Sequence, residues 1–296
     1  MIPVLCGAVT DRWVAALNQH CPSPEYTSEP IQNARVAVFT AGQAGQLNTL
    51  EHLEWAHCTY AGVEKALALT QLPIARLIDP RLSQRMAQSC LSACLNYCQN
   101  SARYHIQQRH QHWKPWDQKA PERTQVLMLG AGVLATHCAT VLSQAGFKVA
   151  TYSRRAKAMP WPHFSKLGPE VIEGAHIVIN LLPATPDTYH WIDDSFLQSF
   201  QQDKLLVNFG RGSAVDDQAL LSWLNTDPSH FALLDVFKTE PLPEESELWG
   251  HPQVQIWPHV SASTDIQSAA AIIHQAIQRY LTEGVTPALV DRDRGY

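Results

Sequence analysis

The sequence predicts an α/β protein made of two doubly wound parallel-sheet domains with a cleft between them. Three observations predict this class. The chain has 296 residues, which is enough for two domains of ordinary size. Short apolar runs alternate with helical patterns from end to end, as in parallel sheets joined by right-handed crossovers. A turn with the spacing GxGxxA follows an apolar run near the middle, which is typical of a Rossmann nucleotide-binding domain.

The first part of the chain predicts a small layer of the flavodoxin-like kind. Its expected strands are the apolar runs at 2–6, 36–40, 54–59 and 74–77. Helical patterns lie between them at 11–18, 47–53 and 63–70. A long helical pattern without Gly or Pro then runs from about 81 to 112, and we expect it to lead into the second domain.

The central part predicts a complete nucleotide-binding domain. Its six expected strands lie at 126–129, 148–152, 176–182, 204–209, 231–236 and 254–257. A closing helix at about 264–283 is expected to cross back toward the first domain, where the tail would finish. We therefore assign residues 1–98 and 284–296 to a substrate domain, and residues 99–283 to an inserted Rossmann domain.

The glycine-rich turn is the expected dinucleotide site. Gly130 permits a tight turn, Gly132 lets the backbone approach a pyrophosphate, and Ala135 lets the next helix pack closely on the strand. Val133 and Leu134 open that helix, whose N-terminal N–H groups favour phosphate. Glycines often only make turns, but a position between a strand and a helix favours nucleotide binding.

The end of the next strand predicts which coenzyme binds. An NAD site usually has an acidic residue about 20 positions beyond the glycines. No Asp or Glu occurs between Gly130 and Glu170, and Ser153, Arg154 and Arg155 arrive there instead. A hydroxyl can hydrogen-bond a 2′-phosphate, and guanidiniums can neutralise it. A solvated basic turn is the alternative, but the missing acid and the two cations together favour NADP(H).

Composition and charge argue against several classes of protein. The net charge of −5 and the lack of basic runs are unlike a general nucleic-acid binder. No apolar segment approaches the ~20 residues of a membrane helix, and the N-terminus makes a poor signal peptide. The seven cysteines, an odd number, suit a reducing compartment, so we expect a cytoplasmic protein.

Cys90, Cys94 and Cys98 are spaced by four residues. They form either a metal site or a stripe of small residues on one helix face that packs against another helix. Ligands stacked along one helix do not converge easily on one ion, so the packed stripe is preferred and no metal is expected. The same face, with Trp113 and Trp116, is also a candidate subunit interface.

Three more stretches follow predicted strands, at the edge where ligands bind in open α/β sheets. They place Arg211, Glu240 and His259 on that edge. A guanidinium can clamp a carboxylate, an imidazolium can donate a proton, and a carboxylate can hold the imidazole. Singly, these residues could be a loop hydrogen-bonder, a helix cap and a turn histidine. Together they suit the reduction of a 2-oxo acid.

At these residues the sequence resembles the D-isomer-specific 2-hydroxyacid dehydrogenases. The segments LLPATPDT at 181–188, NFGRGSAVD at 208–216, DVFKTEPLP at 235–243 and PHVSA at 258–262 follow the GxGxxA turn in family order and spacing. The resemblance covers nearly the whole chain. The segment LWGHP at 248–252 and the ending at 290–296 look most like the glyoxylate/hydroxypyruvate reductase A type.

The resemblance implies roles for named residues. The catalytic trio would be Arg211, Glu240 and His259. The nicotinamide site would add Leu182, Pro183, Thr188 and Asp235, with Asp235 at the carboxamide. Backbone N–H groups of Tyr60, Ala61 and Gly62 would bind the substrate carboxylate together with Arg211, and Arg76 is a weaker candidate for the same task. Tyr60 replaces a smaller residue and the loop at 40–46 lacks an aromatic residue, so the choice among glyoxylate, hydroxypyruvate and bulkier 2-oxo acids stays open.

The expected function is the NADPH-dependent reduction of a small 2-oxo acid to the 2-hydroxy acid. The family resemblance also implies a homodimer that forms through the nucleotide domains. We expect no nucleic-acid or membrane partner. A second hypothesis, from another class, is a catalytically weak NADP(H)-sensing binding protein on the same fold.

Overall fold

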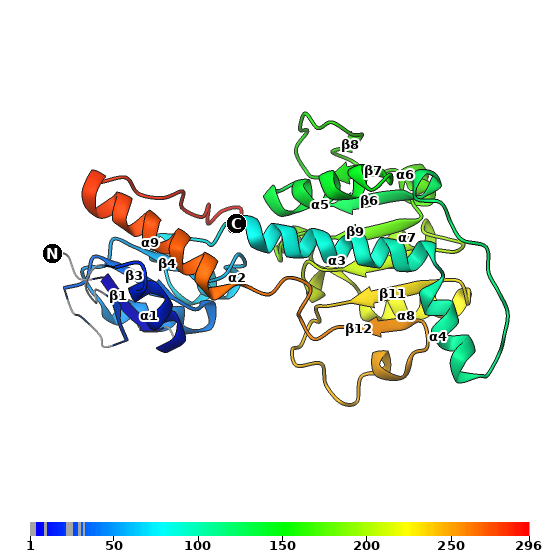
Figure 1. The fold of residues 1–296 in the computed structure, drawn as a ribbon, viewed down its shortest axis with the longest axis horizontal. Coiled ribbons are helices and arrows are strands. Elements are labelled where there is room, and N and C mark those ends of the chain that lie inside the picture. Colours follow the sequence, from blue (N-terminus) through cyan, green and yellow to red (C-terminus); the bar gives the residue numbers. More distant parts are fainter. Residues whose placement is uncertain (1–3, 9–10, 22–25, 29–30, 32, 296) are drawn as a thin grey trace. The chain divides into compact units, whose positions relative to one another are not determined.

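The protein, described by a computed structural model, separates into two compact units (Figure 1). The structure describes residues 4–8, 11–21, 26–28, 31 and 33–295. The terminal unit comprises residues 1–82 and 264–296, and the central unit comprises residues 83–263. Each unit has a parallel sheet with helices, as predicted. Within the described ranges, no helix is both long and apolar enough to cross a bilayer.

The terminal unit contains a five-stranded parallel sheet with the order β2-β1-β3-β4-β5. Its strands are β1 (Val4–Ala8), β2 (Tyr26–Thr27), β3 (Val36–Phe39), β4 (Trp55–Cys58) and β5 (Ile74–Ala75). Four of them match predicted strands, although residues 2 and 3 of the first prediction lie outside the described residues. Strand β2 is not among the predicted strands, because it has only two residues and pairs at the edge of the sheet.

The helices of this unit follow the predictions with one exception. The predicted helices at 11–18 and 63–70 form as α1 (Asp11–Asn18) and α2 (Glu64–Leu69). The predicted α-helix at 47–53 is wrong, because a 3-10 segment, η1 (Ala41–Thr49), ends there instead. Gly42 and Gly45 lie in this segment, and glycine disfavours a regular α-helix.

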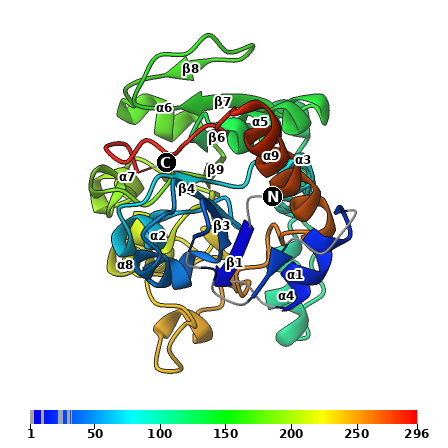
Figure 2. The ribbon, with the colours of Figure 1, turned by 90° about the vertical axis from the view of Figure 1, so that its left-hand side faces the viewer.

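The sheet of the terminal unit is buried on both faces. On β3, Val36 and Val38 belong to one apolar cluster with α1 and α9 (Ile266–Glu283). Ala37 and Phe39 belong to a second cluster with η1 and α2. This alternation is the two-residue period of a strand with apolar partners on both sides. Figure 2 shows this unit, in which α1 and α9 pack against each other.

The division between the units differs from the predicted boundaries at 98/99 and 283/284. Helix α9 belongs to the terminal unit, where Ala269, Ala270, Ile273 and Ile277 are buried against α1 and the sheet. Most of α3 (Pro80–Cys98) belongs to the central unit instead. An amphipathic pattern identifies the buried face of a helix but not the sheet that it covers. Each of these two helices therefore lies in the unit opposite to the predicted one.

The central unit contains a seven-stranded parallel sheet with the order β12-β11-β10-β9-β6-β7-β8. Its strands are β6 (Gln125–Leu129), β7 (Lys148–Tyr152), β8 (His163–Phe164), β9 (Ile177–Asn180), β10 (Leu205–Asn208), β11 (Phe231–Leu234) and β12 (Val254–Ile256). The connecting helices are α5 (Val133–Gln144), α6 (Pro169–Gly174), α7 (Asp194–Gln198) and α8 (Asp217–Thr226). Six strands match the predictions, and β8 is an additional edge strand. The strand order reverses between β6 and β9, the place where such sheets bind ligands.

The long helix predicted from 81 to 112 is two helices. Helix α3 ends at Cys98, and α4 (Ser101–Arg109) follows a break at Asn100, whose φ of 57° is left-handed. The Asn100 side chain donates to the Asp117 carbonyl at 2.8 Å and accepts from Lys119 Nζ at 2.8 Å. Asparagine tolerates this backbone conformation better than most residues, so it ends the helix without Gly or Pro.

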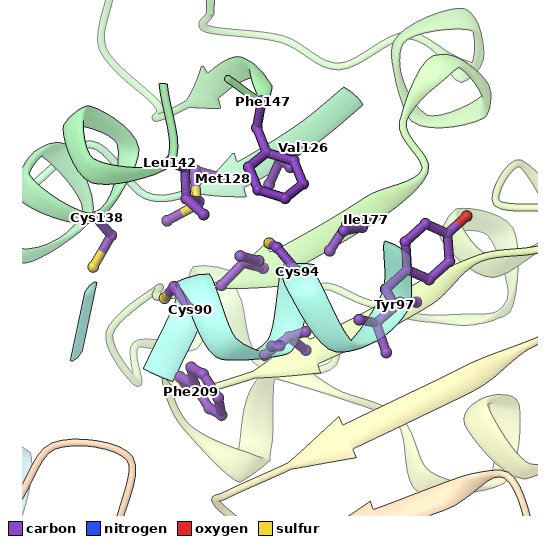
Figure 3. Packing of buried hydrophobic residues seen from close by; sticks show 14 of the residues in the cluster. Cys90, Cys94, Tyr97, Val126, Met128, Cys138, Leu142, Phe147, Ile177 and Phe209 are labelled. Atoms are coloured by element: carbon purple, nitrogen blue, oxygen red, sulfur yellow. The ribbon is translucent and has the colours of Figure 1, made fainter. Parts of the chain in front are cut away.

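The cysteine stripe on α3 is a packing face, as the preferred interpretation states. Cys90 and Cys94 lie in one buried cluster with Val126, Met128 and Cys138 (Figure 3). Burial raises the pKa of the Cys94 thiol well above its usual range. Within the described residues, no group of three or more His, Cys, Asp or Glu is placed to hold a metal. Because the three cysteines are buried inside their own unit, their predicted part in a subunit interface is wrong, whereas the exposed Trp113 stays a candidate.

A buried histidine is expected to make the terminal unit sensitive to acid. His57 on β4 is only 3% exposed, and burial lowers its pKa to about 4 from the usual 6.5. The unfolded chain therefore binds more protons between about pH 6.5 and pH 4, so stability is lost as the pH falls through this window. The loss from this group reaches about 3 kcal/mol at the acid end.

His57→Asn is expected to flatten that pH dependence, because the variant has no imidazole to protonate on unfolding. Urea unfolding at pH 7 and pH 4 measures the change for both proteins. The exposed His52 provides the matched control, since His52→Asn is expected to keep the pH dependence of the parent chain. Equal slopes for the parent chain and His57→Asn would contradict the assignment.

Candidate functional site

The glycine-rich turn has the backbone that a dinucleotide site requires. Gly130 follows β6 with a φ of +119°, and a Cβ there would lie 3.2 Å from the Leu181 carbonyl oxygen. Gly132 is the N-cap residue of α5, and a Cβ on it would meet nothing within 4 Å. The turn is therefore open above Gly132, and the N-terminus of a 12-residue helix lies behind it. Ala135 is buried, which fits close packing of α5 on the sheet.

A lysine that the sequence analysis missed reaches this turn. Lys157 Nζ donates to the Ala131 carbonyl at 2.6 Å, so an ammonium group lies at the middle of the GxGxxA segment. The segment after β7 therefore folds back over the turn. The order of the residues along the chain holds no signal for this contact, because a lysine in a loop is usually only solvated.

The corner after β7 carries the predicted coenzyme-selecting residues. Ser153 Oγ donates to the Arg155 carbonyl at 2.9 Å, which closes a tight turn. Arg154 forms an ion pair with Asp187, which lies in the short 3-10 segment η3 (Pro186–Thr188) after β9. An acid therefore does reach this corner, from a part of the chain beyond the window in which the sequence shows none. Both partners are half exposed, so solvent screens the pair.

The loop after β9 is held by buried polar side chains. Asn180 Nδ2 donates to Asn208 Oδ1 at 2.9 Å, and Asn180 Oδ1 accepts from the Leu182 N–H at 3.1 Å. Thr188 is buried, and its hydroxyl donates to the Pro183 carbonyl at 2.6 Å. Among the predicted coenzyme residues of this loop, Leu182 and Pro183 lie at the sheet edge, and the hydroxyl of Thr188 shapes the loop.

Arg211 lies directly after β10, between two glycines that cannot be replaced without collision. A Cβ at Gly210 would lie 2.8 Å from the Leu182 carbonyl oxygen, and one at Gly212 would lie 1.9 Å from the Phe237 carbonyl carbon. The Arg211 carbonyl accepts from Asn208 Nδ2 at 3.1 Å, and its guanidinium donates to the Gly210 carbonyl at 2.7 Å. Close backbone packing therefore fixes the position of this arginine.

Glu240 and His259 form the pair that the sequence predicts. His259 Nδ1 lies 2.8 Å from Glu240 Oε2. The other oxygen, Oε1, accepts from the Phe237 N–H at 3.0 Å, which orients the carboxylate. The two residues follow β11 and β12, which neighbour β10 on its far side from β9, so they share the ligand edge with Arg211. The His259 side chain is 57% exposed, and Glu240 contacts only its Nδ1, so Nε2 is the ring nitrogen left for a substrate.

Asp235 holds the histidine loop in place. It is buried, and its carboxylate accepts from the Val260 N–H at 2.7 Å and from Ser261 Oγ at 2.5 Å. Its carbonyl accepts from the His259 N–H at 2.9 Å. His259 has a φ of 55°, a conformation that costs energy for a non-glycine residue. Asp235 thus anchors the loop at His259 and at the two residues that follow it, a role that was not predicted from the sequence.

The predicted carboxylate-binding residues share one edge of the terminal sheet. Tyr60, Ala61 and Gly62 follow β4, and Arg76 follows the neighbouring strand β5. The Tyr60 carbonyl accepts from the Leu77 N–H at 3.1 Å, which joins the two loops. The pKa of Arg76 is lowered, because its partial burial outweighs the opposite effect of the nearby Glu64 carboxylate. The Tyr60 side chain is 46% exposed.

Comparison with known proteins identifies the family. Residues 91–261 match the family model described as the D-isomer specific 2-hydroxyacid dehydrogenase, NAD binding domain. The chain is 31% identical over 300 residues to glyoxylate/hydroxypyruvate reductase A of Enterobacter sp. (strain 638), covering 99% of this chain and 93% of that relative.

Solved structures show the same fold. A D-isomer specific 2-hydroxyacid dehydrogenase from Xanthobacter autotrophicus Py2, in complex with NADPH and MES, matches with a TM-score of 0.91 and 29% identity over 100% of this chain and 99% of that chain. The NADPH-dependent glyoxylate/hydroxypyruvate reductase of Sinorhizobium meliloti, in complex with NADP and sulfate, matches with a TM-score of 0.90 and 25% identity, and both chains are covered completely. The chain therefore belongs to the D-isomer-specific 2-hydroxyacid dehydrogenase family.

Proposed function

We propose that this protein is an NADPH-dependent reductase of small 2-oxo acids of the glyoxylate and hydroxypyruvate type. The observation that carries the proposal is the Glu240–His259 pair on the same sheet edge as Arg211, beyond a dinucleotide turn. The names of the relatives support the substrate class, since two of them are glyoxylate/hydroxypyruvate reductases. The two solved structures contain NADPH or NADP, which supports the coenzyme.

The chain offers fitting groups for each part of the coenzyme. The open turn at Gly132 and the N-terminus of α5 suit the pyrophosphate, and Lys157 adds a positive charge there. Ser153, Arg154 and Arg155 suit the 2′-phosphate. Leu182 and Pro183 would line the nicotinamide site. When bound, the reduced nicotinamide supplies the hydride that the carbonyl carbon of a 2-oxo acid accepts.

The remaining chemistry belongs to side chains of this protein. Arg211 binds the substrate carboxylate and polarises the neighbouring carbonyl. His259 donates a proton from Nε2 to the carbonyl oxygen as it becomes an alkoxide. Glu240 accepts from Nδ1–H, so it fixes the orientation of the imidazole ring and leaves Nε2 for the substrate. The backbone N–H groups of 60–62 and the Arg76 side chain remain the predicted carboxylate ligands of the terminal unit.

The coenzyme assignment is tested at the two arginines. Arg154→Ala/Arg155→Ala is expected to weaken NADPH binding by roughly ten- to a hundredfold, because two charge-assisted contacts to the 2′-phosphate are lost. NADH binding is expected to change little, since NADH lacks that phosphate. Fluorescence titration of both coenzymes with both proteins measures the difference. Equal affinity of the unaltered protein for NADH and NADPH would overturn the assignment.

We infer further that the protein is a cytoplasmic homodimer. Trp113, in the loop after α4, is 98% exposed, which is unusual for the largest apolar side chain and typical of an interface anchor. Among the described cysteines, Cys58, Cys90, Cys94, Cys98 and Cys138 are buried thiols without a disulfide, which suits a reducing compartment.

Trp113→Ser is expected to shift the protein toward the monomer, because it removes an apolar anchor from the subunit contact. Light scattering after gel filtration measures the molar mass over a range of concentrations. Trp249→Ser is the matched control, since Trp249 is 54% exposed in a different loop segment, between β11 and β12. A dimer that tolerates Trp113→Ser as well as Trp249→Ser would exclude Trp113 from the contact.

A further inference from the structure

We propose that His163, on the edge strand β8, is a positioning residue that holds the coenzyme-selecting turn and so sets the preference for NADPH over NADH. The proposal rests on the proposed function, because it concerns the same coenzyme site. It concerns a residue that neither the GxGxxA turn nor the catalytic trio includes.

Strand β8 lies beside the C-terminal end of β7, which is the only strand that it pairs with in the described sheet. It pairs Thr151 with His163 and Tyr152 with Phe164 in parallel register. The Pro162 carbonyl, just before β8, accepts from the Thr151 N–H at 2.9 Å, and the Phe164 carbonyl accepts from the Ser153 N–H at 3.1 Å. The backbone entering the turn is therefore fixed by β8 up to Ser153, the first residue that is assigned to the 2′-phosphate.

The His163 side chain continues this support beyond the strand. Nδ1 lies 2.8 Å from Thr151 Oγ1, and Nε2 lies 3.1 Å from the Arg155 carbonyl oxygen and 3.3 Å from Ser153 Oγ. A carbonyl oxygen can only accept a hydrogen bond. His163 Nε2 therefore carries a proton and donates a hydrogen bond to the Arg155 carbonyl. In the neutral ring Nδ1 then accepts from the Thr151 hydroxyl, and Thr151 is completely buried. One imidazole thus joins the buried strand to the far end of the turn.

The arrangement has a consequence for phosphate binding. Ser153 Oγ also donates to the Arg155 carbonyl, at 2.9 Å. The hydroxyl must leave this acceptor in order to donate to a phosphate. Because His163 donates to the same oxygen, the turn keeps one of its two closing hydrogen bonds when the serine turns away. His163 therefore lets Ser153 change partner while Arg154 and Arg155 stay in place.

The decisive experiment measures the ratio of the NADH to the NADPH dissociation constant by fluorescence titration of the full chain. His163→Ala is expected to lower this ratio about three- to tenfold, through weaker NADPH binding with NADH binding nearly unchanged. The kcat at saturating NADPH is expected to stay close to the parent value, because His163 does not touch the trio. His163→Gln is expected to restore most of the ratio, since its amide can donate to the Arg155 carbonyl.

Two further variants separate positioning from stability. Thr151→Val removes the hydroxyl that orients the imidazole and is expected to lower the ratio in the same direction by a smaller factor. His176→Ala is the matched control. His176 Nδ1 accepts from the Gln125 N–H at 3.1 Å, at the N-terminal ends of strands β6 and β9 in the same sheet. This control is expected to leave the ratio unchanged, whatever it does to the unfolding temperature.

An unchanged ratio in both His163→Ala and Thr151→Val would overturn the proposal. An equal loss of NADPH and NADH binding, or a Gln variant no better than Ala, would overturn it as well. If the unaltered protein has no preference for NADPH, the coenzyme assignment in the proposed function is wrong. A clear preference in the unaltered protein that persists in all His163 variants removes only the role of His163.

Discussion

His259→Asn is expected to lower kcat by two to four orders of magnitude, which is the usual contribution of a positioned general acid. The Asn side chain cannot deliver a proton to the forming alkoxide, although it can still hydrogen-bond Glu240. NADPH binding is expected to survive, because the groups assigned to the coenzyme phosphates lie at the other end of the ligand edge. Stopped-flow and steady-state measurements of NADPH oxidation, with a separate NADPH titration, check both parts.

Two further variants serve as comparisons for His259→Asn. Glu240→Gln keeps the shape of the side chain that contacts His259 Nδ1 but removes its charge, so a smaller loss of about ten- to a hundredfold is expected. His251→Asn changes a histidine that follows the 3-10 segment η5 (Glu247–Gly250) in the same region and is expected to have little effect on kcat. A near-normal kcat for His259→Asn would refute the proton-donor role.

Arg211→Lys is expected to lower kcat/KM for the 2-oxo acid by roughly a hundredfold, because an ammonium cannot form the two parallel hydrogen bonds of a guanidinium. Most of the loss should be in KM, since the carboxylate is bound in the ground state, with a further loss in kcat from weaker polarisation of the carbonyl. Initial rates over a wide range of glyoxylate concentrations separate the two.

Arg123→Lys is the control for a charge-conserving change elsewhere in the central unit, and it is expected to leave both parameters as they are. Unaltered NADPH affinity in Arg211→Lys would confirm that the loss concerns the oxo acid. If kcat/KM is unchanged in that variant, Arg211 does not contact the substrate.

The parts of this fold that can be predicted are those with a local signal. The GxGxxA turn follows an apolar strand and precedes a helix, and Gly130 has the positive φ that its place requires. Arg211, Glu240 and His259 each follow a strand, so strand order alone brings them to one edge. The Glu240–His259 contact follows from this placement, because the two residues come after the neighbouring strands β11 and β12.

The parts that could not be predicted depend on contacts between distant segments. Strand β8 has only two residues and forms through pairing with β7, so no periodic pattern in the sequence predicts it. Lys157 and Asp187 reach the coenzyme corner from loops, and the sequence does not show where a loop folds back. Helices α3 and α9 have clear apolar faces, but the sheet opposite each face is chosen by tertiary packing.

We assign the Glu240–His259 pair to hydride reduction of a 2-oxo acid and not to coenzyme sensing. The most direct measurement follows NADPH absorbance with glyoxylate, hydroxypyruvate, pyruvate and phenylpyruvate in turn, with His259→Asn in parallel. We predict rapid NADPH oxidation with glyoxylate or hydroxypyruvate, lost in the variant. A flat trace with all four acids, despite tight NADPH binding, would contradict the claim and favour an NADP(H)-sensing binding protein.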